Sequence, residues 1–105
     1  MAKPDELLNL DVVALSEHFR ARELSPVEVT EAYLKRIEET EQRLHAYVTV
    51  TADLARNSAR DAEKEIMAGR WRGPFHGVPV ALKDLCNTRG ILTTSGSKVL
   101  KEQRP

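Results

Sequence analysis

The strongest local signal in the sequence is the start of a helix at Ser25. Residues 25–28, Ser-Pro-Val-Glu, have the form of a capping box with proline at the first helical position. We expect the Ser25 hydroxyl to accept a hydrogen bond from the Glu28 amide, and the Glu28 carboxylate to reach back to the Ser25 amide. Apolar residues then follow every four positions, at Val29, Tyr33 and Ile37. This pattern predicts a helix from Pro26 to about Arg43 with one face packed against other parts of the chain.

Two further segments carry helical periodicity. The first runs from Asp11, a suitable N-cap, to about Ala21, and its apolar positions are Val12, Leu15 and Phe19. The second runs from about Ala52 to Ala68 and is followed by Gly69, where a glycine cap would stand. Its apolar side consists of Leu54, Ala55, Ala59, Ala62 and Ile66.

Three other segments favour short strands. Residues 47–51 alternate and are rich in β-forming side chains, residues 78–82 form a continuous apolar run, and residues 91–94 lie between two turns. Pro79 cannot donate a hydrogen bond to a ladder, so it indicates the start of a strand or an edge strand. The order of helices and strands predicts an α/β architecture, and so few strands need neighbours to form a stable sheet.

Length and charge exclude several classes of protein. The chain has 105 residues, enough for one domain, and its 16 basic and 16 acidic residues give a net charge of +0. No basic excess exists to neutralise a phosphate backbone, so nucleic acid is not expected as a direct partner. The single cysteine, Cys86, forms no internal disulfide, and no apolar run is long enough to cross a membrane. We therefore expect a cytoplasmic protein without a membrane contact.

Lys83 follows the apolar run at 78–82 and precedes a turn. From the residues alone two interpretations stay open. Lys83 is either the solvated charged end of a strand, which is the commoner case, or a partly desolvated amine at a strand's carboxyl end. Desolvation favours the neutral amine, which can take a proton from a serine hydroxyl.

Longer motifs surround this lysine. Residues 73–84, G-P-F-H-G-V-P-V-A-L-K-D, resemble the segment G-P-L-H-G-I-P-V-A-V-K-D of the amidase-signature family. Residues 90–97, G-I-L-T-T-S-G-S, resemble that family's G-x-x-T-T-x-G-S, and residues 23–29 are similar to its E-L-S-P-V-E-V phrase. The resemblance covers the chain from about Leu10 to Leu100 and rests on a long, unusual core motif.

The resemblance implies a serine–cis-serine–lysine triad that hydrolyses carbon–nitrogen amide bonds of a small-molecule substrate. Lys83 matches the catalytic lysine, with the role of general base acting through the middle serine. The family's glycine- and serine-rich segment, which holds both serines, is expected after Pro105. Residues 1–105 alone are therefore expected to be inactive. Either the chain is truncated, or a missing C-terminal chain or a second copy in a homodimer completes it.

For the fold, the resemblance implies the N-terminal part of a mixed-sheet α/β/α domain. Residues 1–105 would be one partial domain, with a helical hairpin at 1–45 and the start of the α/β core at 46–105. Two alternatives for function remain. One is the amidase subunit of the glutamyl-tRNA(Gln) amidotransferase, which often has Lys-Asp-Asn where this chain has Lys83-Asp84-Leu85. The other is a non-catalytic helical module that binds a partner through its apolar stripes.

The remaining reactive side chains are assigned structural roles. His76 is expected to pack and hydrogen-bond within its loop, Cys86 to be a small buried residue, and Trp71 to anchor a loop. Ser95 and Ser97 are interpreted as turn residues near the site, with a chance of contacting substrate. No histidine or cysteine spacing is typical of a zinc site, and we expect no cofactor or metal; the substrate-binding residues are left unassigned.

Overall fold

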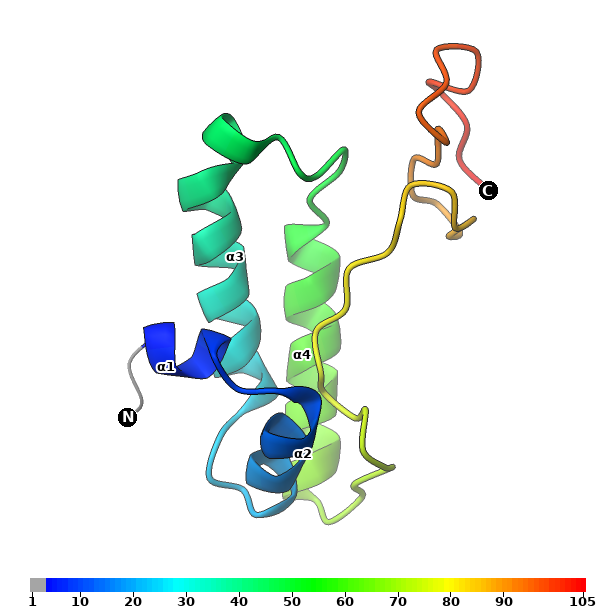
Figure 1. The fold of residues 1–105 in the computed structure, drawn as a ribbon. Helices are drawn as coiled ribbons and strands as arrows, with labels where there is room; N and C mark the ends of the chain where they lie inside the picture. Colours follow the sequence, from blue (N-terminus) through cyan, green and yellow to red (C-terminus); the bar gives the residue numbers. More distant parts are fainter. Residues whose placement is uncertain (1–3) are drawn as a thin grey trace. The chain divides into compact units, whose positions relative to one another are not determined.

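The computed structural model describes residues 4–105, which form two compact units. The first unit comprises the described residues up to Ala46 together with Thr51–Pro79, and it contains all four helices of the described chain (Figure 1). The second comprises Tyr47–Val50 and Val80–Pro105 and consists of loops and turns.

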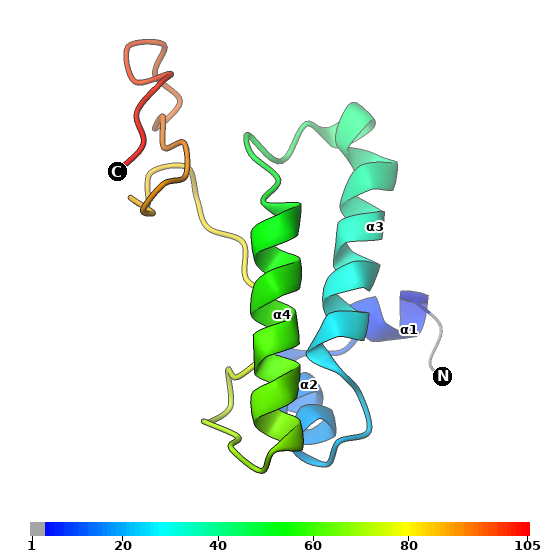
Figure 2. The same cartoon turned by 180° about the vertical axis from the view of Figure 1, so that it is seen from behind.

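The helices are α1 (Pro4–Leu8), α2 (Val12–Arg20), α3 (Pro26–Leu44) and α4 (Ala52–Met67). The three predicted helices are confirmed with ends within about a residue of those expected, whereas α1 was not predicted. In the first unit α3 and α4 lie side by side along much of their length, as both views show (Figures 1 and 2). The short α1 packs against α3.

The start of α3 is held from a helix distant in sequence. The Ser25 hydroxyl accepts a hydrogen bond from the Val27 amide at 3.0 Å and donates one to the Glu63 carboxylate in α4. Ser25 is thus the N-cap, as predicted, but its predicted bond from the Glu28 amide is wrong. The hydroxyl instead bonds to the Val27 amide of its own helix and to the Glu63 carboxylate of α4.

The end of α4 is closed by Gly69, which has a φ of +81°. The Gly69 amide donates to the Ile66 carbonyl at 3.0 Å, and the Arg70 amide donates to the Glu65 carbonyl at 2.8 Å. This pair of bonds is the Schellman arrangement, which favours glycine at the left-handed position. The predicted glycine cap is therefore confirmed.

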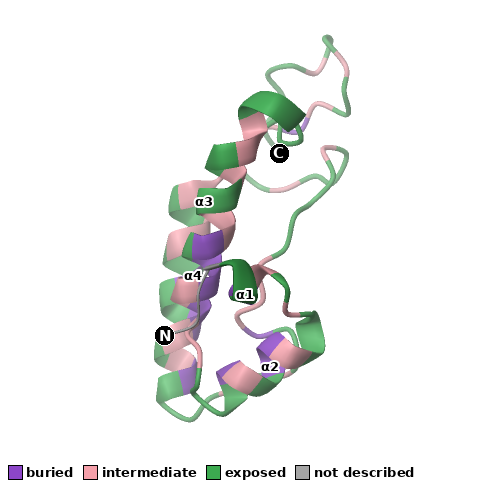
Figure 3. Ribbon diagram, turned by 60° about the vertical axis from the view of Figure 1, so that its left-hand side comes forward, coloured by how far each residue is buried: buried purple, intermediate pink, exposed green. Residues whose placement is uncertain are grey.

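A hydrophobic core joins the helices of the first unit (Figure 3). Its buried members are Leu7, Leu15, Phe19, Val29, Ala32 and Ile66. Phe19 and Val29 are fully buried, and each such side chain contributes roughly 1.5–3 kcal/mol relative to an exposed one. Leu15, Phe19 and Val29 are thus used inside the protein, which removes them from the surface that a partner-binding helical module would need. Two predicted stripe positions are wrong, because Val12 and Leu54 are 40% and 53% exposed.

The predicted α/β fold is wrong, since residues 4–105 contain no strand. Residues 78–82 and 91–94 run as loops, and no ladder pairs them with residues 47–51. The apolar run at 78–82 has no sheet to enter, so Val80 and Leu82 are 79% and 61% exposed. Local β-propensity therefore did not suffice, because a strand is stable only when a neighbour satisfies its backbone and covers its side chains. None of the helices in the described part of the chain combines the length and apolar character that crossing a membrane requires.

Candidate functional site

Lys83 lies in the second unit, at the first position of a turn. The Cys86 amide donates to the Lys83 carbonyl at 2.9 Å and closes this turn. The Lys83 side chain is exposed, so of the two open interpretations residues 4–105 show the solvated lysine and not the desolvated amine. The desolvated amine required a strand at residues 78–82, and no strand forms there.

Asp84 connects the Lys83 turn to the second motif. Its Oδ1 accepts from the Thr94 amide at 2.8 Å, and its Oδ2 accepts from the Thr94 hydroxyl. The Asp84 carbonyl also accepts from the Ser95 amide at 2.8 Å. Three hydrogen bonds therefore join the Lys-Asp end of the segment 73–84 to the Thr-Thr-Ser-Gly turn of the segment 90–97.

These bonds act on the ionised form of Asp84. The Thr94 hydroxyl, followed by the Thr94 amide, holds the pKa of the Asp84 carboxyl below its usual value, while partial desolvation acts in the opposite direction. Because the folded-state pKa is lowered, the stabilisation is present above the unfolded value of about 4. It is lost as the pH falls through the lowered pKa of the folded state.

The turn after Thr94 has its own internal bonds. Ser95 has a φ of +51°, the Gly96 amide donates to the Thr94 hydroxyl oxygen at 3.2 Å, and the Ser97 amide donates to the Thr94 carbonyl at 2.8 Å. The Ser97 hydroxyl accepts from the Val99 amide at 3.1 Å. Ser95 and Ser97 are therefore turn residues, as predicted.

Within the described range, Lys83 is not brought into contact with a hydroxyl nucleophile. No hydrogen bond or ion pair joins its amine to another side chain of residues 4–105. Cys86, predicted to be buried, is an exposed free thiol. The site thus supplies an accessible amine held beside an anchored carboxylate.

The beginning of the same motif belongs to the first unit and has a structural role there. His76 is buried, and its Nδ1 accepts from the Arg72 amide at 2.9 Å, so the neutral ring carries its proton on Nε2. That Nε2 lies 3.8 Å from Oε2 of Glu65 in α4. The predicted role of His76 in packing and hydrogen bonding is confirmed.

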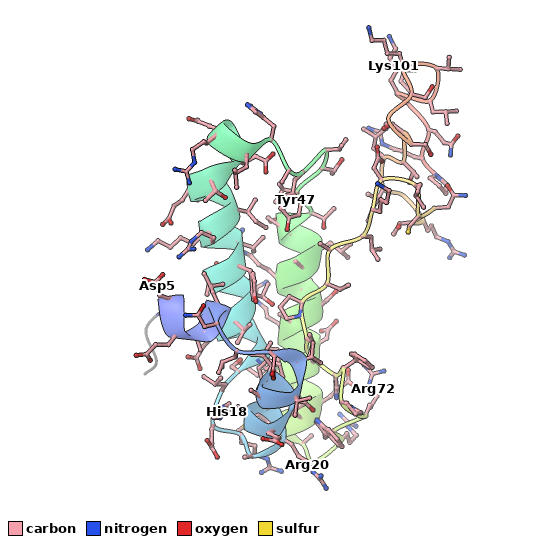
Figure 4. All side chains as sticks on the ribbon, in the orientation of Figure 1. Asp5, His18, Arg20, Tyr47, Arg72 and Lys101 are labelled. Atoms are coloured by element: carbon pink, nitrogen blue, oxygen red, sulfur yellow. The ribbon has the colours of Figure 1, made fainter. Side chains whose placement is uncertain are left out.

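Trp71 anchors the loop that leaves α4, as predicted. Its ring packs partly buried against the core, and the Arg20 guanidinium of α2 lies 4.8 Å from the ring centroid. Arg72 holds the same loop by an ion pair of 2.9 Å with Glu65 of α4 (Figure 4 labels both arginines). No metal-binding group of three His, Cys, Asp or Glu side chains gathers anywhere in residues 4–105.

The pairing of Asp84 with Thr94 was not predicted from the sequence. Both residues stand in motifs that resemble the amidase-signature family, but ten positions separate them and no helical or strand period relates them. The only sequence signal for this pairing was the pair of threonines in the second motif, and it does not indicate which residue they bond.

Comparison with known proteins identifies the relationships of this chain. The family model described as Amidase matches residues 28–105. The glutamyl-tRNA(Gln) amidotransferase A subunit of Geobacter sulfurreducens is 50% identical over 95 residues, covering 90% of this chain and 19% of the relative. A protein of the same name from Carboxydothermus hydrogenoformans is 44% identical over 100 residues, covering 95% of this chain and 21% of the relative.

A third relative is named differently. An amidase of Pseudomonas putida is 44% identical over 91 residues, covering 87% of this chain and 19% of the relative. The chain thus spans about a fifth of the length of the curated relatives it matches. No solved structure matches it.

Proposed function

The chain belongs to the amidase family, and on this premise we propose that it supplies the catalytic lysine, Lys83, of an enzyme that hydrolyses amide bonds. The single observation that carries the proposal is the position of Lys83 inside the motif at 73–84, within the matched range 28–105. The Asp84–Thr94 pairing supports it, because it holds this motif against the second one.

The proposed mechanism follows the serine–cis-serine–lysine pattern that the motifs imply. A nucleophilic serine attacks the amide carbonyl, the amine leaves, and water hydrolyses the acyl-enzyme. The middle serine passes the nucleophile's proton to the neutral Lys83 amine, which returns a proton to the leaving group. No segment of the 105 residues matches the glycine- and serine-rich motif that holds the two serines. We therefore propose that both serines lie in further polypeptide that packs against residues 1–105.

The surroundings of Lys83 support this placement. The apolar side chains on either side of it in the sequence are uncovered: Val80 is 79%, Leu82 61% and Leu85 56% exposed. Chain that covered these residues would also withdraw the neighbouring amine from water. Desolvation disfavours the ammonium form and so favours the neutral amine, which is the form that acts as a general base.

A chimera tests the role of Lys83. Residues 1–105 would replace the matching segment of the Pseudomonas putida amidase, to which they are 44% identical. We expect Lys83→Ala to lower kcat for a small amide by about 1,000-fold or more, since the base acts together with both serines. Lys98→Ala is the matched control, because Lys98 is also an exposed lysine of the second unit. Near-normal hydrolysis by the Lys83→Ala chimera, with the protein folded, would refute the assigned role.

A second candidate is the amidase subunit of a glutamyl-tRNA(Gln) amidotransferase, which the 50% identity to the Geobacter sulfurreducens protein favours. In this case the amide would be the side chain of glutamine, and further subunits would be partners. Leu85 stands where that subunit often has asparagine, which favours a general amidase. The two candidates are separated by placing residues 1–105 in each relative in turn. The amidotransferase assignment predicts glutamine-dependent amidation of glutamyl-tRNA(Gln) by the second chimera once it is assembled with its partners.

A further inference from the structure

The Asp84 side chain, next to Lys83 in the sequence, is hydrogen-bonded through both of its oxygens to one residue of the second motif. Both carboxylate oxygens of Asp84 accept from Thr94, one from its amide at 2.8 Å and one from its hydroxyl. The Asp84 carbonyl accepts from the Ser95 amide, also at 2.8 Å. All of these groups lie in the second unit, which has no helix or strand to fix its loops.

This arrangement has two consequences for Lys83. First, the Ser95 amide holds the Asp84 carbonyl and Thr94 holds the Asp84 side chain, while the Cys86 amide holds the Lys83 carbonyl at 2.9 Å. The turn that carries the lysine is thus held by hydrogen bonds on both sides. Second, Thr94 holds the carboxylate of the adjacent residue, and within residues 4–105 no ion pair joins that carboxylate to the exposed Lys83 amine. The amine is therefore left available while its attachment point is ordered.

We propose that Asp84 is a positioning residue for Lys83 and that Thr94 holds Asp84 in place. The Asp84–Thr94 pair thus acts as a clamp, which orders the turn that carries Lys83 for catalysis. The catalytic part of this inference rests on the proposed function. The ordering part does not rest on the proposed function, because it concerns only the hydrogen bonds that hold the turn. Each part has a separate measurement.

The ordering part is tested by NMR relaxation on the 105-residue protein. We expect Thr94→Val, which removes the hydroxyl at nearly constant shape, to raise the mobility of the Lys83 and Cys86 amides. Thr94→Ser should restore the order, since it keeps the donor. Thr40→Val is the matched control, because the Thr40 hydroxyl also donates to a backbone carbonyl, that of Arg36 at 2.8 Å, but lies in α3 and not in the lysine turn. Unchanged amide mobility in both Thr94→Val and Asp84→Ala would overturn the clamp.

The catalytic part is tested in the Pseudomonas putida chimera. Misplacement of a catalytic group by about 1 Å can cost on the order of 100-fold, so we expect Thr94→Val to lower kcat by about 10- to 100-fold. The KM should stay within about twofold, as for loss of an interaction that acts only in the transition state, and Thr94→Ser should recover most of kcat. A purely structural role would instead lower the yield of folded enzyme and leave its kcat intact.

The outcomes separate the two proposals. If Lys83→Ala abolishes hydrolysis while Thr94→Val and Asp84→Ala keep the parental kcat, the positioning role is overturned and the proposed function stands. If Lys83→Ala keeps its activity, the proposed function and the catalytic part of the clamp fail together. The NMR comparison then still decides whether Asp84 and Thr94 order the turn.

Discussion

At the scale of single residues, Gly77 shows how the first part of the motif at 73–84, which belongs to the first unit, packs against the helices. Gly77 has a φ of +86°, and a Cβ placed on it would lie 2.6 Å from Cγ of Pro26 and 3.4 Å from the Phe19 ring. Both neighbours belong to the interior of the first unit, and Pro26 and Phe19 are fully buried. A side chain at position 77 therefore has neither a relaxed backbone conformation nor room.

We predict that Gly77→Ala lowers the free energy of unfolding by about 2–4 kcal/mol, the sum of backbone strain and a contact that must shift. Gly69→Ala is the matched control, because Gly69 has nearly the same φ, +81°, but its nearest contact is Arg22 at 3.9 Å. The control should therefore lose only the strain, about 1 kcal/mol. Urea unfolding followed by helical circular dichroism measures both. Equal losses in the two variants would contradict the packing role of Gly77.

At the scale of elements, the helices followed from local pattern because each one carries its own boundary signals. Asp11 caps α2 by accepting from the Ala14 amide at 2.8 Å, Pro26 begins α3, and Gly69 closes α4. The predicted strands failed for the opposite reason. Residues 78–82 have the composition of a buried strand, but a ladder needs a partner that no local pattern specifies. The five-residue α1 was missed because it is too short to show a period and depends on Leu7 packing into the core.

The N-terminus of α3 gives the prediction at this scale. Ser25→Ala removes the cap on the Val27 amide and the hydrogen bond to Glu63, so we expect a loss of about 1–2 kcal/mol in the free energy of unfolding. Ser58→Ala is the control, since Ser58 is exposed on α4 and alanine is the better helix former. It should be neutral or slightly stabilising. A Ser25→Ala loss no larger than that of the control, in the same urea unfolding experiment, would show that the observed cap does not contribute.

At the scale of the whole molecule, the site was predicted in part. The family motif predicts that Lys83 is the catalytic lysine, and this role stays a prediction. The hydrogen bonds that hold its turn could not be predicted from the motif and are seen only in the structure. The two units also differ in how their backbone groups are satisfied. The first has regular helices around a core. The second has isolated backbone hydrogen bonds between loops, such as those from the Gly90 amide to the Pro105 carbonyl at 2.6 Å and from the Thr93 amide to the Gln103 carbonyl at 2.9 Å. Local stability follows the number of buried contacts and protected hydrogen bonds.

Amide hydrogen exchange on the 105-residue protein should therefore resolve the two units. We expect the central amides of α3 and α4 to exchange slowest, whereas within the second unit only hydrogen-bonded amides such as Thr94 and Ser95 should show protection. Asp84→Ala removes the carboxylate that bonds the Thr94 amide and hydroxyl, so it should abolish the protection of Thr94 and weaken that of Ser95. The α3 and α4 amides serve as the internal reference, because their hydrogen bonds lie within the helices. Protection of Thr94 that survives Asp84→Ala would mean that another acceptor holds this turn in solution.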